Sequence, residues 1–196
     1  MTELVTQTTY FEQRGQDNTD RTLKLAYARA QGLGLRTALV ATTSGRTGVR
    51  AAQVLQGMDV IAVTHSTGFS APNVQQLTAE NRAVIEAAGG RILTCQHAFG
   101  GVNRAVRKKL NTYQLDEIIA YTLRLFCEGI KVVAEMALMA ADAGLVRTDT
   151  PVMAIAGSGR GADTAAVLLP TNAQTFFDLK ILEIVCRPSP GHPSFG

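Results

Sequence analysis

The stretch that decides the fold is Thr37-Ala-Leu-Val-Ala-Thr-Thr-Ser-Gly-Arg-Thr47. Its first five residues, 37–41, form a short apolar run, which predicts a buried strand. A polar turn follows, and apolar residues then recur at helical spacing, at positions 49, 52 and 55. A strand, a turn and a helix in this order open a βαβ unit, so the stretch indicates an α/β fold with a parallel sheet.

The same alternation of short apolar runs and helical patterns continues along the chain. Further strands are expected at Val60–Thr64, Arg91–Cys95 and Val152–Ala156, with a helix that starts at Pro72 and a long helix from about Leu115 to Ala143. Right-handed crossovers place helices on both faces of such a sheet. We therefore predict a three-layer α/β sandwich whose four parallel strands, numbered along the chain, lie in the order 3-2-1-4.

The two ends of the chain have a different character. Ala166–Leu169 and Phe176–Cys186 are predicted to be antiparallel strands, because the second run alternates apolar and polar residues. A short strand is also expected at Thr9–Phe11. We expect one domain over residues 1–186 and a loose tail rich in proline and glycine over residues 187–196.

Composition excludes several classes of protein. A net charge of +3 in 196 residues is too small to indicate nucleic-acid binding, and the basic cluster at 104–109 has no aromatic stacking platform beside it. No apolar run reaches the ~20 residues of a membrane span, and no secretory signal is recognisable, so we expect a cytoplasmic protein without membrane contact. Three widely spaced cysteines fit free thiols in a reducing compartment, and no group of residues has metal-ligand spacing.

Two glycine-rich polar loops each follow a predicted parallel strand. They are Thr42-Thr43-Ser44-Gly45-Arg46-Thr47 and Gly157-Ser158-Gly159-Arg160-Gly161-Ala162-Asp163-Thr164. Glycine lets a backbone approach a ligand closely, and hydroxyls, N–H groups and arginine bind phosphate. Loops at the carboxyl ends of neighbouring strands meet in one crevice. We therefore predict a site for a phosphorylated small molecule between them, to which His65 and Gly68 contribute from the next strand end.

Each of these features also has a plainer interpretation. The first loop is then an ordinary turn that caps a helix, and the second is a solvated loop. Asp163 either accepts a hydrogen bond from a sugar or ribityl hydroxyl or fixes its own loop. His65 and His97 both follow predicted strands, and three interpretations of them are open. They contact the ligand, they act as a general acid or base, or they form hydrogen bonds only to the backbone.

Charged residues punctuate the predicted long helix. Glu128, Glu135 and Asp142 recur every seven residues, and Lys131 precedes Glu135 by four. We favour a solvated stripe with an i,i+4 ion pair; the alternative places this face at the ligand or at a subunit interface. The apolar residues at 134–140 cover a wider arc than one sheet face requires, so we expect a homo-oligomer.

The first loop and its surroundings resemble the C-terminal domain of pyruvate kinase. The turn at 42–47 matches that domain's T-x-S-G-R-[ST] pattern, and Val60–Thr64 matches its next strand at the same spacing. In pyruvate kinases activated by sugar bisphosphates, this turn holds a phosphate of the activator and a second glycine-rich loop closes over the ligand. Gly157–Thr164 occupies the comparable place.

A family of small free-standing proteins with this fold and no kinase barrel resembles the chain nearly from end to end. The matching motifs are Tyr10-Phe11, Asn18-Thr19, Thr64-His65, Thr67-Gly68-Phe69, Met139–Gly144, Gly161–Ala165 and Phe176-Phe177-Asp178. The resemblance implies flavin mononucleotide (FMN) as the ligand, although Arg46 stands where some relatives have an acidic residue. It implies no pyruvate kinase activity, because that chemistry belongs to a barrel of about 250 residues. An enzyme acting on a phosphorylated metabolite, a flavin-dependent oxidoreductase and a regulatory subunit that senses a sugar phosphate remain alternatives.

Overall fold

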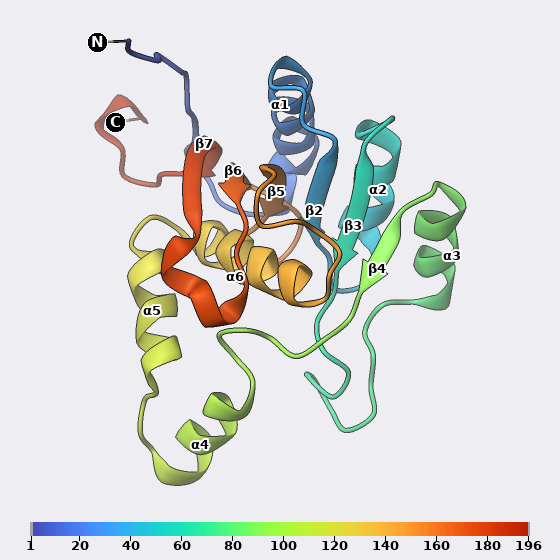
Figure 1. The fold of residues 1–196 in the computed structure, drawn as a ribbon, viewed down its shortest axis with the longest axis vertical. Helices are drawn as coiled ribbons and strands as arrows, with labels where there is room; N and C mark the ends of the chain where they lie inside the picture. The colour runs from blue at the N-terminus through green and yellow to red at the C-terminus, as the bar shows by residue number, and fades with distance from the viewer. Residues whose placement is uncertain (1, 196) are drawn as a thin grey trace.

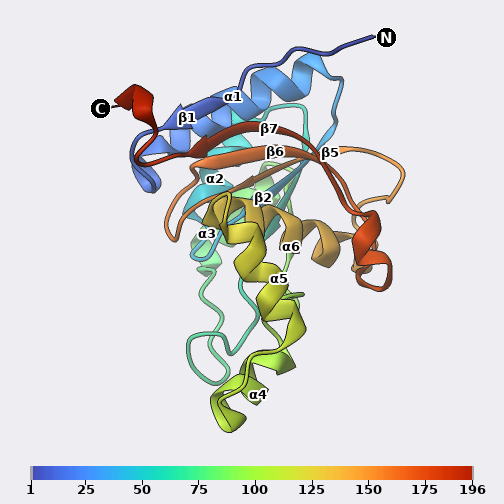
Figure 2. The same cartoon turned by 90° about the vertical axis from the view of Figure 1, so that its left-hand side faces the viewer.

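A computed structural model describes residues 2–195 and shows one seven-stranded sheet with helices on both faces (Figures 1 and 2). The strands are β1 (Thr9–Phe11), β2 (Thr37–Ala41), β3 (Asp59–Val63), β4 (Arg91–Leu93), β5 (Val152–Ala156), β6 (Thr164–Leu169) and β7 (Lys180–Pro188). The helices are α1 (Thr19–Gly32), α2 (Arg46–Val54), α3 (Ala79–Ala87), α4 (Val102–Leu110), α5 (Leu115–Arg124) and α6 (Glu128–Asp142). Short 3₁₀ helices occupy Gln16–Asn18, Ala173–Asp178 and Pro193–Phe195.

The sheet order is β1-β7-β6-β5-β2-β3-β4. Its parallel part, β4-β3-β2-β5, confirms the predicted order 3-2-1-4. β6 pairs antiparallel with β5, and β7 pairs antiparallel with β6, as predicted for the C-terminal strands. β1 adds a parallel edge beside β7. The chain changes direction across the sheet between β2 and β5, and a crevice forms at such a switch point.

Two apolar cores lie on opposite faces of the sheet. On one face, α1 and α2 cover strand residues that include Val40 and Ile155. On the other face, α6 covers Leu39, Ile61 and Ala154. The alternation of Leu39 and Val40 between the cores follows from the period of two in a strand. No helix of residues 2–195 is long and apolar enough to cross a membrane.

The predicted single helix from 115 to 143 is wrong, because the chain breaks at Leu125–Cys127 between α5 and α6. Cys127 has an extended backbone, with φ 179° and ψ 168°, and Arg187 donates to the Phe126 carbonyl at 2.7 Å. The chain turns there, so that α5 packs on the outer side of α6 (Figure 2). The wide apolar arc of α6 is therefore covered within one chain, by the sheet on one side and by α5 and the 173–178 turn on the other.

Other predicted boundaries also differ from the structure. The helix expected at Pro72 begins at Ala79, where the Thr78 hydroxyl accepts from the Asn81 amide at 3.2 Å and caps it. Residues 64–78 form a long loop instead. Phe176–Asp178 lies in a 3₁₀ helix rather than a strand, and β7 extends to Pro188, two residues into the expected tail.

Candidate functional site

A cleft of about 1380 Å³ opens where β2, β3 and β5 end. Both predicted loops line it, through Thr42, Thr43, Ser44, Arg46 and Thr47 on one side and Gly157, Ser158, Gly159, Arg160 and Gly161 on the other. His65 lines it as well. Gly45, Gly68, Asp163 and Thr164 are not among the residues of the described chain that line it. The structure thus brings most of the predicted site together.

The β2–α2 loop has the local geometry of an anion site. Gly45 has φ 101°, and a Cβ there would lie 2.4 Å from the Asn81 Cβ, so only glycine fits. The Thr42 hydroxyl accepts from the Gly48 amide at 3.3 Å. Within residues 2–195, the N–H groups of Arg46 and Thr47 have no hydrogen-bond acceptor. The N-terminus of α2 therefore offers free donors and the positive end of its dipole to the cleft.

The β5–β6 loop is held by Asp163, which is fully buried. Its Oδ2 accepts from the amides of Gly15 at 2.8 Å and Ser158 at 3.1 Å, and its Oδ1 accepts from the Thr164 hydroxyl at 2.8 Å. Of the two interpretations of Asp163, the structure therefore supports the one in which it fixes the loop. Gly161 has φ 69° and packs against Thr19, so its role is also structural.

Positive charge dominates the lining of the cleft. The lining contains six cationic side chains and only three carboxylates. The cationic residues are Arg14, Arg46, Arg104, Arg124, Lys131 and Arg160. Arg124 pairs with Glu128 at 2.5 Å and Lys131 pairs with Glu135. The other four form no ion pair within the described residues. An anionic ligand would neutralise this excess.

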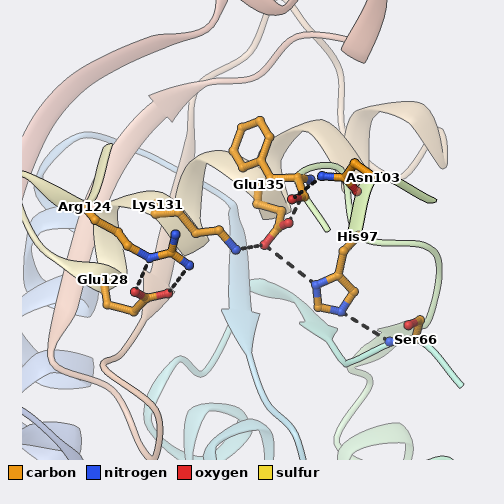
Figure 3. Close-up of polar contacts among 8 residues, drawn as sticks. Ser66, His97, Asn103, Arg124, Glu128, Lys131 and Glu135 are labelled. Carbon is orange, nitrogen blue, oxygen red and sulfur yellow. Dashed lines mark hydrogen bonds and ion pairs between the residues drawn. The ribbon is translucent and has the colours of Figure 1, made fainter. Parts of the chain in front are cut away.

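The inner wall of the cleft is formed by α6, and it corrects the favoured interpretation of that helix as a solvated stripe. Lys131 and Glu135 are only 6% and 3% exposed, and both face the cleft (Figure 3). Most of α6 is buried, so these two charged residues lie away from solvent, whereas Glu128 and Asp142 at the ends of the helix keep partly exposed side chains. Asp142, at the far end of the helix, instead accepts from the amide of Ala173 at 3.1 Å.

Glu135 is the centre of a polar network on this wall (Figure 3). Its Oε1 accepts from the Phe99 amide at 2.9 Å, and its Oε2 accepts from the Lys131 ammonium and lies 3.8 Å from His97 Nδ1. Burial alone would raise the pKa of Glu135, but the neighbouring His97 and Lys131 outweigh it and lower the pKa to about 2. The buried carboxylate is therefore ionised.

Two histidines and a phenylalanine close this end of the cleft. His65 Nδ1 lies 2.9 Å from the Gln76 side-chain oxygen, which places the proton on Nδ1. Burial lowers the pKa of His65, so the ring is neutral at pH 7. The Phe69 ring lies 4.0 Å from His65 and 5.1 Å from His97 between ring centroids. The guanidinium of Arg104 lies over the Phe69 ring, 4.9 Å from its centroid.

Sequence reasoning found the loops of this site but not its inner wall. Lys131 and Glu135 were interpreted as a surface pair because their i,i+4 spacing is common on exposed helices. The signal that could have found them is the composition of α6, in which charged residues interrupt a helix that is otherwise apolar all round. Such a helix is buried, so its charges need partners or a ligand.

Comparison with known proteins gives a family and two distant structures. The sequence model of the family "Pyruvate kinase, alpha/beta domain" matches residues 20–168. A pyruvate kinase from Cryptosporidium parvum has a TM-score of 0.38 and 11% identity, over 76% of this chain and 23% of that one. O-ureido-L-serine synthase, in a variant with O-ureido-L-serine bound, has a TM-score of 0.31 and 20% identity, over 69% and 49%. The chain thus spans less than half of either protein, and similarity at this level supports no inference about function.

Proposed function

The chain belongs to the pyruvate kinase alpha/beta domain family, and from that premise we propose that it binds a phosphorylated small molecule in the cleft between its β2–α2 and β5–β6 loops. The observation that carries the proposal is the excess of unpaired arginines around two glycine-containing loops and an open helix N-terminus. Phosphate dianions bind best where fixed N–H groups, hydroxyls and guanidinium groups converge.

We place the phosphate at the start of α2. Ser44 and Thr47 supply hydroxyls there, the first turn of the helix has free amides, and Arg46 supplies the counter-charge. Arg160 and Arg14 lie on the opposite wall and provide further positive charge. The β2–α2 loop is rigid enough for this role, because Asn81 Nδ2 donates to the Ser44 carbonyl at 2.9 Å and locks the loop to α3.

FMN is the specific ligand that we propose, on the basis of the family resemblance. The flat rings of His65, His97 and Phe69 at one end of the cleft would suit a planar ring system, and the α2 loop would hold its phosphate. When bound, FMN would supply one- and two-electron redox chemistry. A sugar phosphate is the alternative. Absorbance and mass spectrometry of whatever co-purifies with the protein distinguish the two.

Removal of the phosphate contacts tests the proposal. Ser44→Ala combined with Arg46→Ala should lower the affinity for FMN at least tenfold, since charge-assisted hydrogen bonds contribute roughly 1.5–3 kcal/mol each. Arg160→Ala should lower the affinity for FMN as well. Arg21→Ala is the matched control, because Arg21 is an exposed arginine outside the cleft. Isothermal titration of each variant with FMN, riboflavin and inorganic phosphate provides the measurement. Equal losses for FMN and riboflavin would show that the loop does not hold the phosphate.

We also propose that the protein is a cytoplasmic homo-oligomer without pyruvate kinase activity of its own. The free thiols of Cys95, Cys127 and Cys186 fit a reducing compartment. The surface that supports self-association is an apolar stripe formed by Leu115, Ile118 and Tyr121 on α5 and by Leu125 directly after it, all more than half exposed.

A further inference from the structure

We infer that the inner wall of the cleft is a proton-transfer centre, and that its substrate is a phosphorylated sugar with a carbonyl beside a hydroxyl-bearing carbon. The inference rests on the sugar-phosphate alternative of the proposed function, because the β2–α2 loop must hold the phosphate while the other end of the substrate reaches the wall, which a bound FMN ring would occupy. It is carried by three side chains from two segments, in which Lys131 on α6 and His97 after β4 meet at the carboxylate of Glu135 on α6 (Figure 3).

His97 is the base of this centre. Its Nδ1 faces the Glu135 carboxylate at 3.8 Å, and its Nε2 accepts from the Ser66 amide at 3.4 Å. This arrangement places the proton on Nδ1 and a lone pair on Nε2. A 3.4 Å hydrogen bond is long, so a substrate group can replace it at little cost. Because the ring is only 11% exposed, water does not compete freely for that lone pair.

Lys131 is the electrophile. Its ammonium carries three donors, and within the described residues only Glu135 accepts from it. The other two donors are buried on the wall of the cleft, where they can bind a carbonyl oxygen. The ammonium is paired with the ionised Glu135, which suits it to stabilise an oxyanion rather than to act as the nucleophile of a Schiff base.

These roles give a balanced proton transfer. His97 Nε2 removes the proton from the hydroxyl-bearing carbon next to the carbonyl, and the C–H electron pair becomes the C=C bond of an enediolate. The carbonyl π pair moves onto its oxygen, which the Lys131 ammonium stabilises. The imidazolium then returns the proton to either carbon, so the substrate is regenerated or, after a hydroxyl proton moves between the two oxygens, isomerised. Glu135 is a positioning residue, which stabilises the imidazolium and touches no reacting atom.

Other charged groups surround His97. Glu135 and Lys131 face it from α6, His65 lies 5.4 Å away between ring centroids, and Arg104 lies beyond the Phe69 ring that stacks on it. Ser66 offers His97 its backbone amide. The geometry therefore favours proton transfer over the nucleophilic hydrolysis that a serine–histidine pair would support.

Solvent exchange tests the inference. Wild-type protein is incubated in D₂O with dihydroxyacetone phosphate, D-ribulose 5-phosphate or D-fructose 6-phosphate, and loss of the C–H signal beside the carbonyl is followed by ¹H NMR. At least one compound should exchange faster than in buffer alone.

His97→Asn and Lys131→Gln should each slow the exchange at least a hundredfold, the usual scale for loss of a general base. Glu135→Gln should slow it and shift the pH profile, while Glu86→Gln should change nothing, because Glu86 forms an i,i+4 pair with Arg82 on the exposed face of α3.

Several results would overturn the inference. No exchange with any of the three compounds would do so, as would full exchange in a His97→Asn variant whose circular dichroism spectrum matches that of wild type. Release of inorganic phosphate without exchange would indicate hydrolysis instead. Calorimetric titration of the same compounds separates the two proposals. If the compounds bind in a way that depends on Ser44 and Arg46 but no exchange occurs, only this inference is refuted. If their affinity does not change when both residues are replaced, the proposed phosphate site is refuted.

Discussion

At the residue scale, a close approach between α6 and β6 leaves no room for a side chain at Gly129. A Cβ on Gly129 would lie 2.0 Å from Thr164 Oγ1, and the fully buried Thr164 cannot move because its hydroxyl bonds Asp163. Gly129→Ala should therefore destabilise the protein by about 1–3 kcal/mol. Gly32→Ala is the matched control, since Gly32 also lies in a helix but has open space around it, and it should be neutral or slightly stabilising. Urea denaturation compares the two; equal losses would contradict the proposed close contact.

Glu135 should make stability depend on pH in the acid range. Its pKa in the folded protein is about 2, below the ordinary 4.5, so the unfolded chain takes up the proton first. The stabilisation is complete above about pH 5 and is lost as the pH falls from 4.5 toward 2. The size is roughly 3 kcal/mol, at 1.36 kcal/mol for each pKa unit. We expect Glu135→Gln to be less stable than wild type at pH 7 and nearly equal to it at pH 2. A difference that does not change over this range in urea titrations would refute the assignment.

The residues of the loops were predictable and the residues of the inner wall were not. Ser44 and Arg46 lie next to a strand and a glycine, which are local signals. The environment of Glu135 depends on His97, which is 38 residues away, and on the burial of α6 by α5. Such contacts depend on tertiary packing, which a spacing of four residues does not record.

At the element scale, Asp163 ties the β5–β6 loop to the segment before α1. Asp163→Ala would leave the amides of Gly15 and Ser158 and the Thr164 hydroxyl without an acceptor, which should cost at least ~2 kcal/mol. Hydrogen exchange of the Gly15 and Ser158 amides should quicken selectively. Asp178→Ala, at an exposed aspartate, is the control and should leave both amides protected. If both amides stay protected in Asp163→Ala as well, Asp163 does not fix the loop.

The elements themselves were predicted well where their ends carry a local signal. β2 and β5 are bounded by polar turns, and Gly144 follows the end of α6 with φ 69°. The break at Leu125–Cys127 contains no glycine or proline, so the apolar period runs through it without interruption. The start of α3 was placed too early because Pro72 is a favoured first helical residue, whereas the Thr78 cap marks the true start.

At the scale of the whole molecule, the order of the sheet determines where the site lies. β3 and β4 extend the sheet from β2 in one direction, and β6 and β7 extend it from β5 in the other. The loops after β2 and β5 therefore diverge and leave the cleft between them. The helices α5 and α4 extend beyond this end of the sheet (Figure 1) and leave one face of α5 uncovered.

Copies of the chain are expected to associate through the exposed apolar stripe at α5. The apolar arc of α6, from which an oligomer is expected on sequence grounds, is buried within one chain, but Ile118 on α5 and Leu125 directly after it are 53% and 84% exposed. We expect wild type to sediment as an oligomer at micromolar concentration, because stripes of this kind are usually buried against a partner. Ile118→Lys combined with Leu125→Lys should give a folded monomer with an unchanged circular dichroism spectrum. Val84→Lys, at a valine of α3 that is 42% exposed, should leave the assembly intact. A wild-type monomer, or an oligomer that survives the α5 changes, would show that this stripe is not the interface.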